Sequence, residues 1–236
     1  MSWEGNVRKV VPYVAGEQPK EQDVIKLNTN ENPYPPAPGV AAAIRGFDCD
    51  VLRRYPDPDV SALVEALAKR HGLDKEQVFA GVGSDDVLAM SFLTFFHSGR
   101  PILFPDITYS FYDVWADLYR IPYEVQPLDD DFGIRKEDYF RENGGIVIAN
   151  PNAPTGVAAD RSVCEEIVRA NPDSVVIIDE AYVDFGGESC VPLIDRYDNL
   201  LVVQTFSKSR SMAGMRIGYA MGSRKLIRYL NDVKFS

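Results

Sequence analysis

The segment Val175-Val-Ile-Ile-Asp-Glu-Ala-Tyr182 joins an uninterrupted apolar run to two carboxylates and a tyrosine. A short apolar run without a polar face, rich in β-branched residues, is typical of a strand that is buried on both sides. Strands of this kind belong to parallel sheets that helices cover on both faces. We therefore expect such a sheet at the centre of the chain, with Asp179 at the carboxyl end of one strand.

Similar apolar runs recur along the chain, and longer amphipathic stretches separate most of them. We expect strands at 78–80, 102–104, 146–149, 175–178, 200–203 and 217–221, and helices at 86–96, 109–118, 161–168 and 224–233. Another helix is expected from Val60, where apolar residues repeat at helical spacing after a possible cap at Asp59. This alternation predicts an α/β fold, a three-layer αβα sandwich with a mainly parallel sheet.

The beginning of the chain has a different character. The stretch Leu27-Asn-Thr-Asn-Glu-Asn-Pro-Tyr-Pro-Pro-Ala-Pro-Gly39 is rich in Pro and Asn and has no sustained apolar period. Such composition is typical of turns and loops. We expect residues 1–55 to form an irregular arm and residues 56–236 to form the main domain.

Composition limits the possible partners and the compartment. The chain has 236 residues, 45% of them hydrophobic, and a net charge of −10, which disfavours a polyanion such as nucleic acid. The longest apolar runs are too short to span a membrane, and the first residues lack a signal-peptide pattern. The three cysteines are dispersed, as expected in a reducing compartment, so we predict a cytoplasmic protein. His71 and His97 have no partners at ligand spacing, and no metal site is expected.

Three of the expected strands end in unusual polar sequences: Asn150-Pro-Asn-Ala-Pro-Thr-Gly156, Asp179-Glu-Ala-Tyr182 and Thr205-Phe-Ser-Lys208. Ligands of open α/β sheets bind beyond the carboxyl ends of the strands. Partial burial of Lys208 would disfavour its ammonium form, which is what an amine nucleophile needs in order to attack an aldehyde. The plainer alternative is a solvated loop lysine.

Two glycine-containing loops have the composition of an anion site. Gly81-Val-Gly-Ser-Asp85 leads into a helix whose first amides are unpaired, and Gly214-Met-Arg-Ile-Gly218 offers a guanidinium between glycines. Together they would cradle a phosphate. Taken singly, Ser84 is equally consistent with a helix cap and Arg216 with a surface charge.

The carboxylate of Asp179 would need a cationic or hydrogen-bonding partner at the mouth of a buried strand. A protonated pyridine nitrogen would serve, with Tyr182 near the phenolic oxygen of the same ring. Tyr109 would stack on a ring face, or else pack against the core as a residue at a helix start. An apolar run ending in Asp-Glu also occurs beside the phosphate loop of ATPases. However, no G-x-x-x-x-G-K-[ST] loop accompanies it here.

Taken in order, Gly83-Ser84-Asp85, Tyr109, NPNAPTG, IDEAY, TFSK and AGMRIGYA resemble the class I and II aminotransferases, which have fold type I and use pyridoxal phosphate. The resemblance covers nearly the whole chain, and its specificity lies in the ordered set of motifs. Within that class, the LNTNENPYP stretch and Arg54-Tyr55-Pro56-Asp57 look like the histidinol-phosphate aminotransferase branch.

The resemblance implies roles for individual residues. Lys208 would carry the cofactor as a Schiff base, Asp179 would pair with the pyridine nitrogen, Tyr182 would donate to the phenolic oxygen and Tyr109 would stack on the ring. The residues implied around the phosphate are Ser84, Asp85, Thr205, Ser207 and Arg216. Tyr55 would reach into the active site of the neighbouring subunit of a homodimer. Tyr55 and Asn30 are the residues implied at the substrate, and Asn30 would border the substrate pocket.

The chain departs from the family pattern at two places. Many relatives have Asn directly before Pro-Thr-Gly, where this chain has Ala153, so Asn152 is assigned to the cofactor in its stead. Relatives also continue beyond the position of Ser236 into a small domain, which carries the arginine that grips the donor carboxylate. We therefore expect that small domain to be absent from this chain.

The implied reaction is amino-group transfer from L-histidinol phosphate to 2-oxoglutarate, giving imidazole-acetol phosphate and glutamate, a step of histidine biosynthesis. Lys208 would move the proton as base and acid. Two alternatives remain open at this point. One is another activity of the same fold, namely an aromatic or other amino-acid aminotransferase, a decarboxylase or a lyase. The other is a truncated fragment that binds cofactor without turnover.

Overall fold

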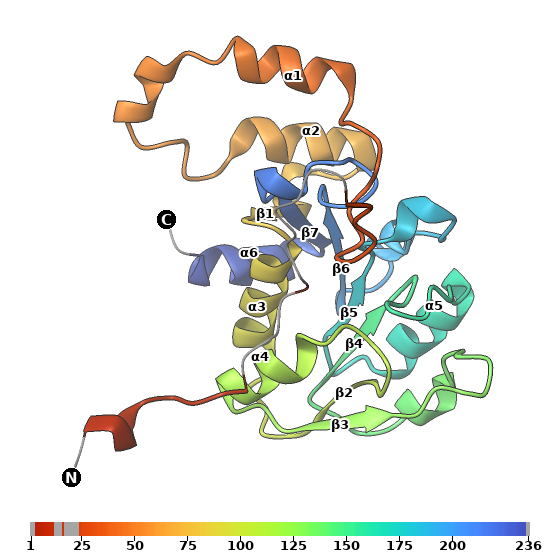
Figure 1. The fold of residues 1–236 in the computed structure, drawn as a ribbon. Helices are drawn as coiled ribbons and strands as arrows, with labels where there is room; N and C mark the ends of the chain where they lie inside the picture. Colours follow the sequence, from red (N-terminus) through yellow and green to blue (C-terminus); the bar gives the residue numbers. More distant parts are fainter. Residues whose placement is uncertain (1–2, 12–15, 17–23, 235–236) are drawn as a thin grey trace.

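Seven strands form one sheet in the computed structural model, which describes residues 3–11, 16 and 24–234. Their order across the sheet is β1-β7-β6-β5-β4-β2-β3 (Figure 1). The strands are β1 (Val78–Gly81), β2 (Ile102–Pro105), β3 (Tyr123–Gln126), β4 (Gly145–Ala149), β5 (Val176–Asp179), β6 (Leu200–Thr205) and β7 (Gly218–Gly222).

The sheet is mainly parallel, as the sequence predicts. Strands β6, β5, β4, β2 and β3 pair in parallel, and β7 alone runs antiparallel to both of its neighbours, β6 and β1. In the register of the central strands, Asp179 lies beside Ala149 on one side and Val203 on the other. The carboxyl ends of these three strands are therefore close to level.

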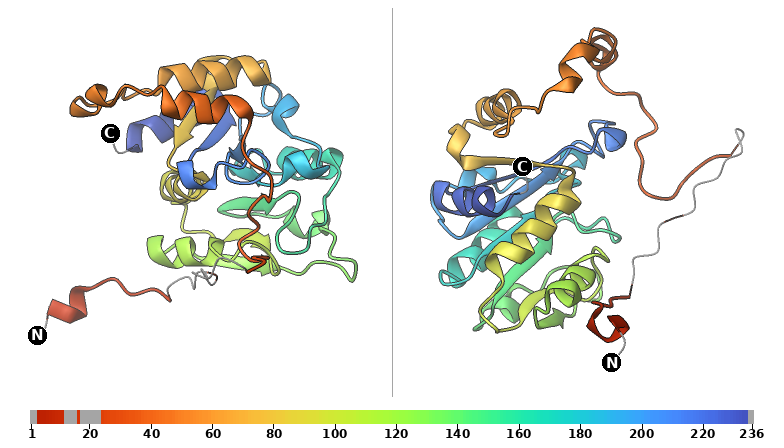
Figure 2. Two further views of the ribbon diagram at one scale, coloured as in Figure 1. Left: turned by 45° about the horizontal axis from the view of Figure 1, so that its top comes forward. Right: turned by 90° about the vertical axis from the view of Figure 1, so that its left-hand side faces the viewer.

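Helices cover both faces of the sheet, so the expected three-layer α/β architecture is confirmed (Figures 1 and 2). On one face, α3 (Ser84–Phe95), α4 (Tyr112–Tyr119) and α6 (Arg224–Val233) enclose one apolar core. On the other face, α2 (Ser61–His71) and α5 (Arg161–Ala170) enclose a second core. Residues that alternate along each strand contribute to the two cores in turn, as in Ile177 and Ile178 of β5.

The structure differs from the sequence-based expectation in several local features, one of which is that α4 begins at Tyr112, so Tyr109 precedes the helix by three residues. Strand β3 has no apolar run because it is an edge strand, and its first three residues are exposed. The expected cap at Asp59 is wrong. The residue before α2 is Val60, in a left-handed conformation with φ 49°, and the carboxylate of Asp57 accepts from the Ser61 amide at 2.8 Å. The capping carboxylate thus comes from two residues further upstream.

The N-terminal segment contains short regular pieces that the sequence pattern does not reveal. These are η1 (Trp3–Asn6), α1 (Pro38–Arg45) and η2 (Cys49–Arg53), and α1 lies on the outer side of α2 (Figures 1 and 2). No residue of α1 is buried, and such a helix lacks the apolar contacts that would make it predictable from periodicity.

Short 3₁₀ helices connect the main elements, and two of them, η5 after β5 and η7 before β7, adjoin strands of the site. They are η3 (Lys75–Gln77), η4 (Lys136–Tyr139), η5 (Val183–Phe185), η6 (Val191–Leu193) and η7 (Ala213–Met215). Among the described residues, no helix combines the length and the apolar character that a membrane crossing requires.

Candidate active site

A cavity of about 230 Å³ opens at the carboxyl ends of the parallel strands. Its walls come from segments that are far apart in the sequence but meet at this edge of the sheet. The structure brings nine of the predicted site residues together here. The lining consists of Thr29, Glu31, Ser84, Asp85, Tyr109, Ala149, Ala153, Asp179, Ala181, Tyr182, Thr205, Ser207, Lys208, Ala213 and Arg216.

Lys208 lies in the turn that follows β6, half-buried in the cavity wall. Its ammonium nitrogen donates to the backbone oxygen of Thr29 at 2.9 Å and lies 5.4 Å from the ring centre of Tyr182. The hydroxyl of Tyr182 in turn accepts from the Asn30 side-chain amide at 2.9 Å. Thr29 of the arm therefore contacts the lysine, whereas Asn30, a predicted site residue, lines a neighbouring cavity together with Tyr182.

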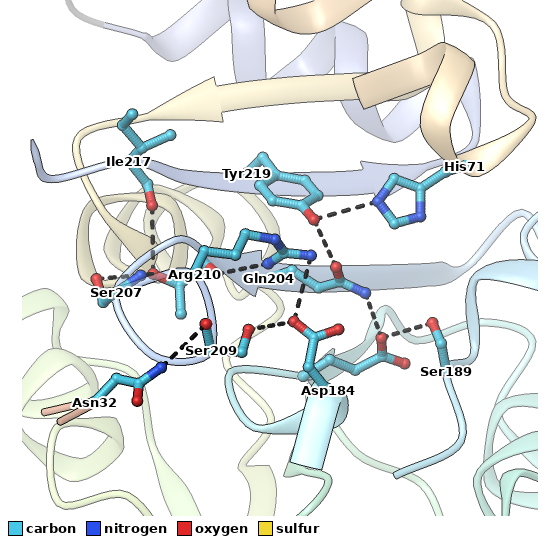
Figure 3. Close-up of polar contacts among 12 residues, drawn as sticks. Asn32, His71, Asp184, Ser189, Gln204, Ser207, Ser209, Arg210, Ile217 and Tyr219 are labelled. Carbon is cyan, nitrogen blue, oxygen red and sulfur yellow. Dashed lines mark hydrogen bonds and ion pairs between the residues drawn. The ribbon is translucent and has the colours of Figure 1, made fainter. Parts of the chain in front are cut away.

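A set of polar contacts fixes the Lys208 turn (Figure 3). The guanidinium of Arg210 donates to the backbone oxygen of Thr205 at 2.8 Å and pairs with Asp184 of η5 at 3.5 Å. Ser209 donates its hydroxyl to Asp184, and its backbone oxygen accepts from Asn32 at 3.1 Å. Contacts from β6, η5 and the arm thus restrain the turn on three sides, which holds the amine in place.

Asp179 ends β5 and is only 5% exposed. One carboxylate oxygen accepts from the Tyr112 hydroxyl at 2.8 Å and the other from the Ala181 amide at 3.1 Å. Burial raises the pKa of Asp179 to about 6, and these two hydrogen bonds oppose that rise. A cation placed in the cavity next to this carboxylate would favour its ionised form.

The other end of the cavity is suited to an anion. Gly83 caps the N-terminus of α3 with φ 91°, and Arg216 lies close enough that a Cβ on Gly83 would come within 2.5 Å of its guanidinium. Arg216 pairs at 3.2 Å with Asp85, which also accepts from the Tyr109 hydroxyl at 2.9 Å. The free amides of a helix N-terminus and a guanidinium together favour a bound phosphate.

Gly218 permits this close approach of the loop before α3 to the start of β7. An added Cβ at Gly218 would lie 2.2 Å from the Ser84 amide nitrogen and 2.3 Å from the Gly83 carbonyl carbon. These are backbone atoms, so relief would require the loop itself to move. The position therefore excludes any side chain.

We expect Gly218→Ala to lower the free energy of unfolding by about 1–3 kcal/mol, because the loop must shift to admit the methyl group. The same shift should weaken the binding of inorganic phosphate. Urea unfolding and calorimetric titration with phosphate measure the two effects. Gly214→Ala is the matched control, since no atom lies within 4 Å of its added Cβ. Equal behaviour of the two variants would contradict the prediction.

The remaining predicted residues lie elsewhere. Asn152 is buried, and its amide donates to the Ile107 oxygen at 2.8 Å and the Thr155 hydroxyl at 3.0 Å. It lines a neighbouring cavity, not the one at Lys208, which Ala153 lines instead. Tyr55 is fully exposed beyond η2 and does not reach this chain's cavity.

The structure also shows buried polar residues at this edge that sequence analysis missed. Glu180 accepts hydrogen bonds from Ser189 and Gln204, both at 2.7 Å, and Tyr219 links Gln204 to His71 (Figure 3). Burial raises the pKa of Glu180 to about 7. Its only sequence signal was its place beside Asp179. Tyr112 had a signal of the same kind, because it follows Tyr109 by three residues at a helix start.

Among the described residues, no cluster of three or more His, Cys, Asp or Glu side chains has the proximity needed to hold a metal ion. The cavity is lined by the amine of Lys208, the buried carboxylate of Asp179, the guanidinium of Arg216 and several hydroxyls, with the more exposed carboxylates of Glu31 and Asp85 also in its wall.

The family model for aminotransferase class I and II matches residues 22–235. The chain belongs to the class I and II aminotransferases. It is 59% identical over 236 residues to a histidinol-phosphate aminotransferase of Lactococcus lactis subsp. cremoris, which covers 100% of this chain and 66% of that protein. It is 56% identical to histidinol-phosphate aminotransferase 2 of Dechloromonas aromatica, covering 99% of this chain and 67% of that protein.

A solved structure shares the fold. The histidinol-phosphate aminotransferase of Sinorhizobium meliloti, in complex with pyridoxal-5'-phosphate, superposes with a TM-score of 0.79 at 24% identity and covers 87% of this chain and 58% of that one. The described fold thus corresponds to a part of that longer chain. The chain itself spans about two thirds of the length of the relatives it matches.

Proposed function

We propose that this chain is the cofactor-binding part of a histidinol-phosphate aminotransferase, with pyridoxal phosphate held at Lys208. One observation carries the proposal. The amine of Lys208, the carboxylate of Asp179 and the guanidinium of Arg216, which come from separate segments, line a single cavity. Each of these groups matches a different part of pyridoxal phosphate.

The residues present fit that cofactor. Asp179 is a buried carboxyl group, and burial raises its pKa to about 6. A protonated ring nitrogen would be a positively charged partner that stabilises the ionised form of Asp179. The N-terminus of α3 and Arg216 would take the phosphate, with hydroxyls of Thr205 and Ser207 on the same wall. Tyr109 offers a ring face and Tyr182 a hydroxyl in the lining of the same cavity.

Pyridoxal phosphate supplies an aldehyde that condenses with amines and a ring that accepts electrons from the carbon next to the amine. The part of this chain is to orient that chemistry. Asp179 would hold a proton on the ring nitrogen, and Tyr182 would face the phenolic oxygen. The amine of Lys208 would serve as the base and acid that moves a proton at the substrate Cα.

We expect the chain, mixed with pyridoxal phosphate, to show a visible absorbance band that borohydride removes while the intact mass rises by one cofactor. Lys208→Ala should show neither the band nor the added mass, because Lys208 supplies the one amine in the cavity wall among the residues that the structure describes. Lys225→Ala, an exposed lysine of α6, is the control and should behave as wild type. Persistence of the adduct in Lys208→Ala would refute the assignment of Lys208.

The amino donor is proposed from the relatives. Those of 56–59% identity are named histidinol-phosphate aminotransferases, and the proposed reaction exchanges an amino group between L-histidinol phosphate and 2-oxoglutarate. The proposed donor and acceptor are small molecules. A nucleic-acid partner is not proposed, because the net charge of −10 disfavours binding to a polyanion. We propose a cytoplasmic enzyme of histidine biosynthesis, with an arm at 1–55 and a cofactor domain at 56–236.

In single-turnover mixing, we expect L-histidinol phosphate to change the spectrum of the bound cofactor at least about tenfold faster than L-phenylalanine or L-aspartate. The measurement is stopped-flow absorbance with each donor alone. A faster reaction with phenylalanine would indicate an aromatic aminotransferase, and release of carbon dioxide would indicate a decarboxylase. Reaction only after extension to the length of the relatives would identify the 236-residue chain as a cofactor-binding fragment.

We further propose that the protein is a homodimer in which Tyr55 completes the partner's site. Large apolar side chains of the segment from α1 to Tyr55 are exposed, and Tyr55 itself is fully so. An exposed apolar patch of this kind is typical of an interaction surface. The identity of the occupant as a second copy follows the family resemblance.

Mixing two inactive variants tests the shared site. Tyr55→Ala, which lacks a proposed substrate contact, and Lys208→Ala, which lacks the proposed base, should each react slowly with L-histidinol phosphate as homodimers. After the subunits are exchanged, a mixed dimer contains one site with both residues intact, so about half of its sites should regain the wild-type rate. Stopped-flow absorbance of the bound cofactor measures this. If mixing restores no sites, Tyr55 does not act across the interface.

A further inference from the structure

Tyr112, the first residue of α4, contacts the proposed site without lining the cavity. It is fully buried, and its hydroxyl donates to Asp179 at 2.8 Å. Tyr112 belongs to none of the sequence motifs that indicate a site. We propose that Tyr112 is a positioning residue, whose hydroxyl orients the Asp179 carboxylate and keeps it ionised for the cofactor nitrogen; this rests on the function proposed above.

The position of Tyr112 is fixed by its ring. The ring packs among aromatic neighbours, with centres 5.7 Å from Tyr109, 5.9 Å from Phe104, 6.2 Å from Phe92 and 6.3 Å from Trp115. Packing of this kind explains the burial of the ring but not the hydroxyl. A phenylalanine would fill nearly the same space without the cost of burying a polar group. The hydroxyl is therefore the feature that requires a specific explanation.

The contact fixes the carboxylate at two points. Tyr112 donates to one oxygen of Asp179, and the Ala181 amide donates to the other at 3.1 Å. Each carboxylate oxygen retains a second acceptor site, and Asp179 lines the cavity. Two donors on the protein side thus set the plane of the carboxylate and leave its remaining acceptor capacity for the cavity.

Tyr112 stays a donor over the whole working range of pH, because burial and the nearby Asp179 charge raise its pKa well above the ordinary value for tyrosine. Asp179 faces several charged groups. Burial raises its pKa and the hydrogen bonds from Tyr112 and Ala181 lower it, while the charge of Asp85 raises it and that of Lys208 lowers it. Glu180 is the adjacent carboxyl.

The sign of the pH effect follows from these contacts. Pairing with a protonated ring nitrogen requires an ionised Asp179, so cofactor binding is lost as the pH falls through the pKa of this carboxyl. Removal of the Tyr112 hydroxyl removes an interaction that lowers that pKa. Binding should therefore be lost at a higher pH in Tyr112→Phe than in wild type.

The experiment measures the affinity of the full chain for pyridoxal phosphate between about pH 5 and 8. In Tyr112→Phe the midpoint of the acid limb should move up by about one pH unit, the usual effect of a hydrogen bond to a charged group. In ¹⁵N-labelled cofactor, the ring nitrogen signal should move toward the unprotonated value. Tyr139→Phe is the matched control, because Tyr139 is 1% exposed and packs in the other core.

The outcomes separate this inference from the proposed function. If wild type binds no cofactor at Lys208, the proposed function fails and the inference fails with it. If wild type binds but Tyr112→Phe leaves the limb and the nitrogen signal in place, or moves them no more than Tyr139→Phe does, only the inference is overturned. If Tyr112→Phe does not fold, the tyrosine at position 112 can be replaced by difluorotyrosine, whose hydroxyl is a stronger hydrogen-bond donor. The acid limb of cofactor affinity should then move to lower pH. An acid limb that does not move overturns the inference.

Discussion

The common direction of the central strands is the constraint on which the site depends. Because β4, β5 and β6 are parallel and in close register, the residues that follow each strand emerge at one edge of the sheet. Asp179 and the turn that carries Lys208 are therefore neighbours although they are separated in sequence. The two buried cores, one on each face, keep the strands in that register, and the cavity opens at the edge where the strands end.

Much of the fold was predictable because buried strands have a simple sequence signature. Uninterrupted apolar runs such as that of β5 predicted the interior strands. Strand β3 was not predictable in this way, because an edge strand with exposed residues has no apolar run. The reversed direction of β7 was also beyond the pattern, since periodicity reports burial but carries no information on strand order or direction. Helix α1 buries nothing, so periodicity could not reveal it.

The candidate site also contains some residues that the sequence predicts and others that it does not. Lys208, Asp179 and Arg216 were predictable because charged residues placed directly beside buried strands need a reason to be there. The backbone oxygen of Thr29, which accepts from the lysine, carries no sequence signal, because every residue has such an oxygen. Tyr112 has a side chain equally suited to a core, and only coordinates show where its hydroxyl points. Asn152 was assigned to the cofactor because it lies one residue before Ala153 in the sequence. The direction of its side chain depends instead on the loop conformation, which turns its amide toward Ile107 and Thr155.

The reversal of β7 has a consequence for the way the site is built. A chain that leaves one strand and enters an antiparallel neighbour returns to the sheet where it left, so the connection from β6 to β7 never crosses to the far edge. Lys208 and Arg216 both lie on that one short connection. Amine and guanidinium therefore enter the site on one connection, and contacts with the arm, with η5 and with Asp85 of α3 hold that connection at the edge of the sheet.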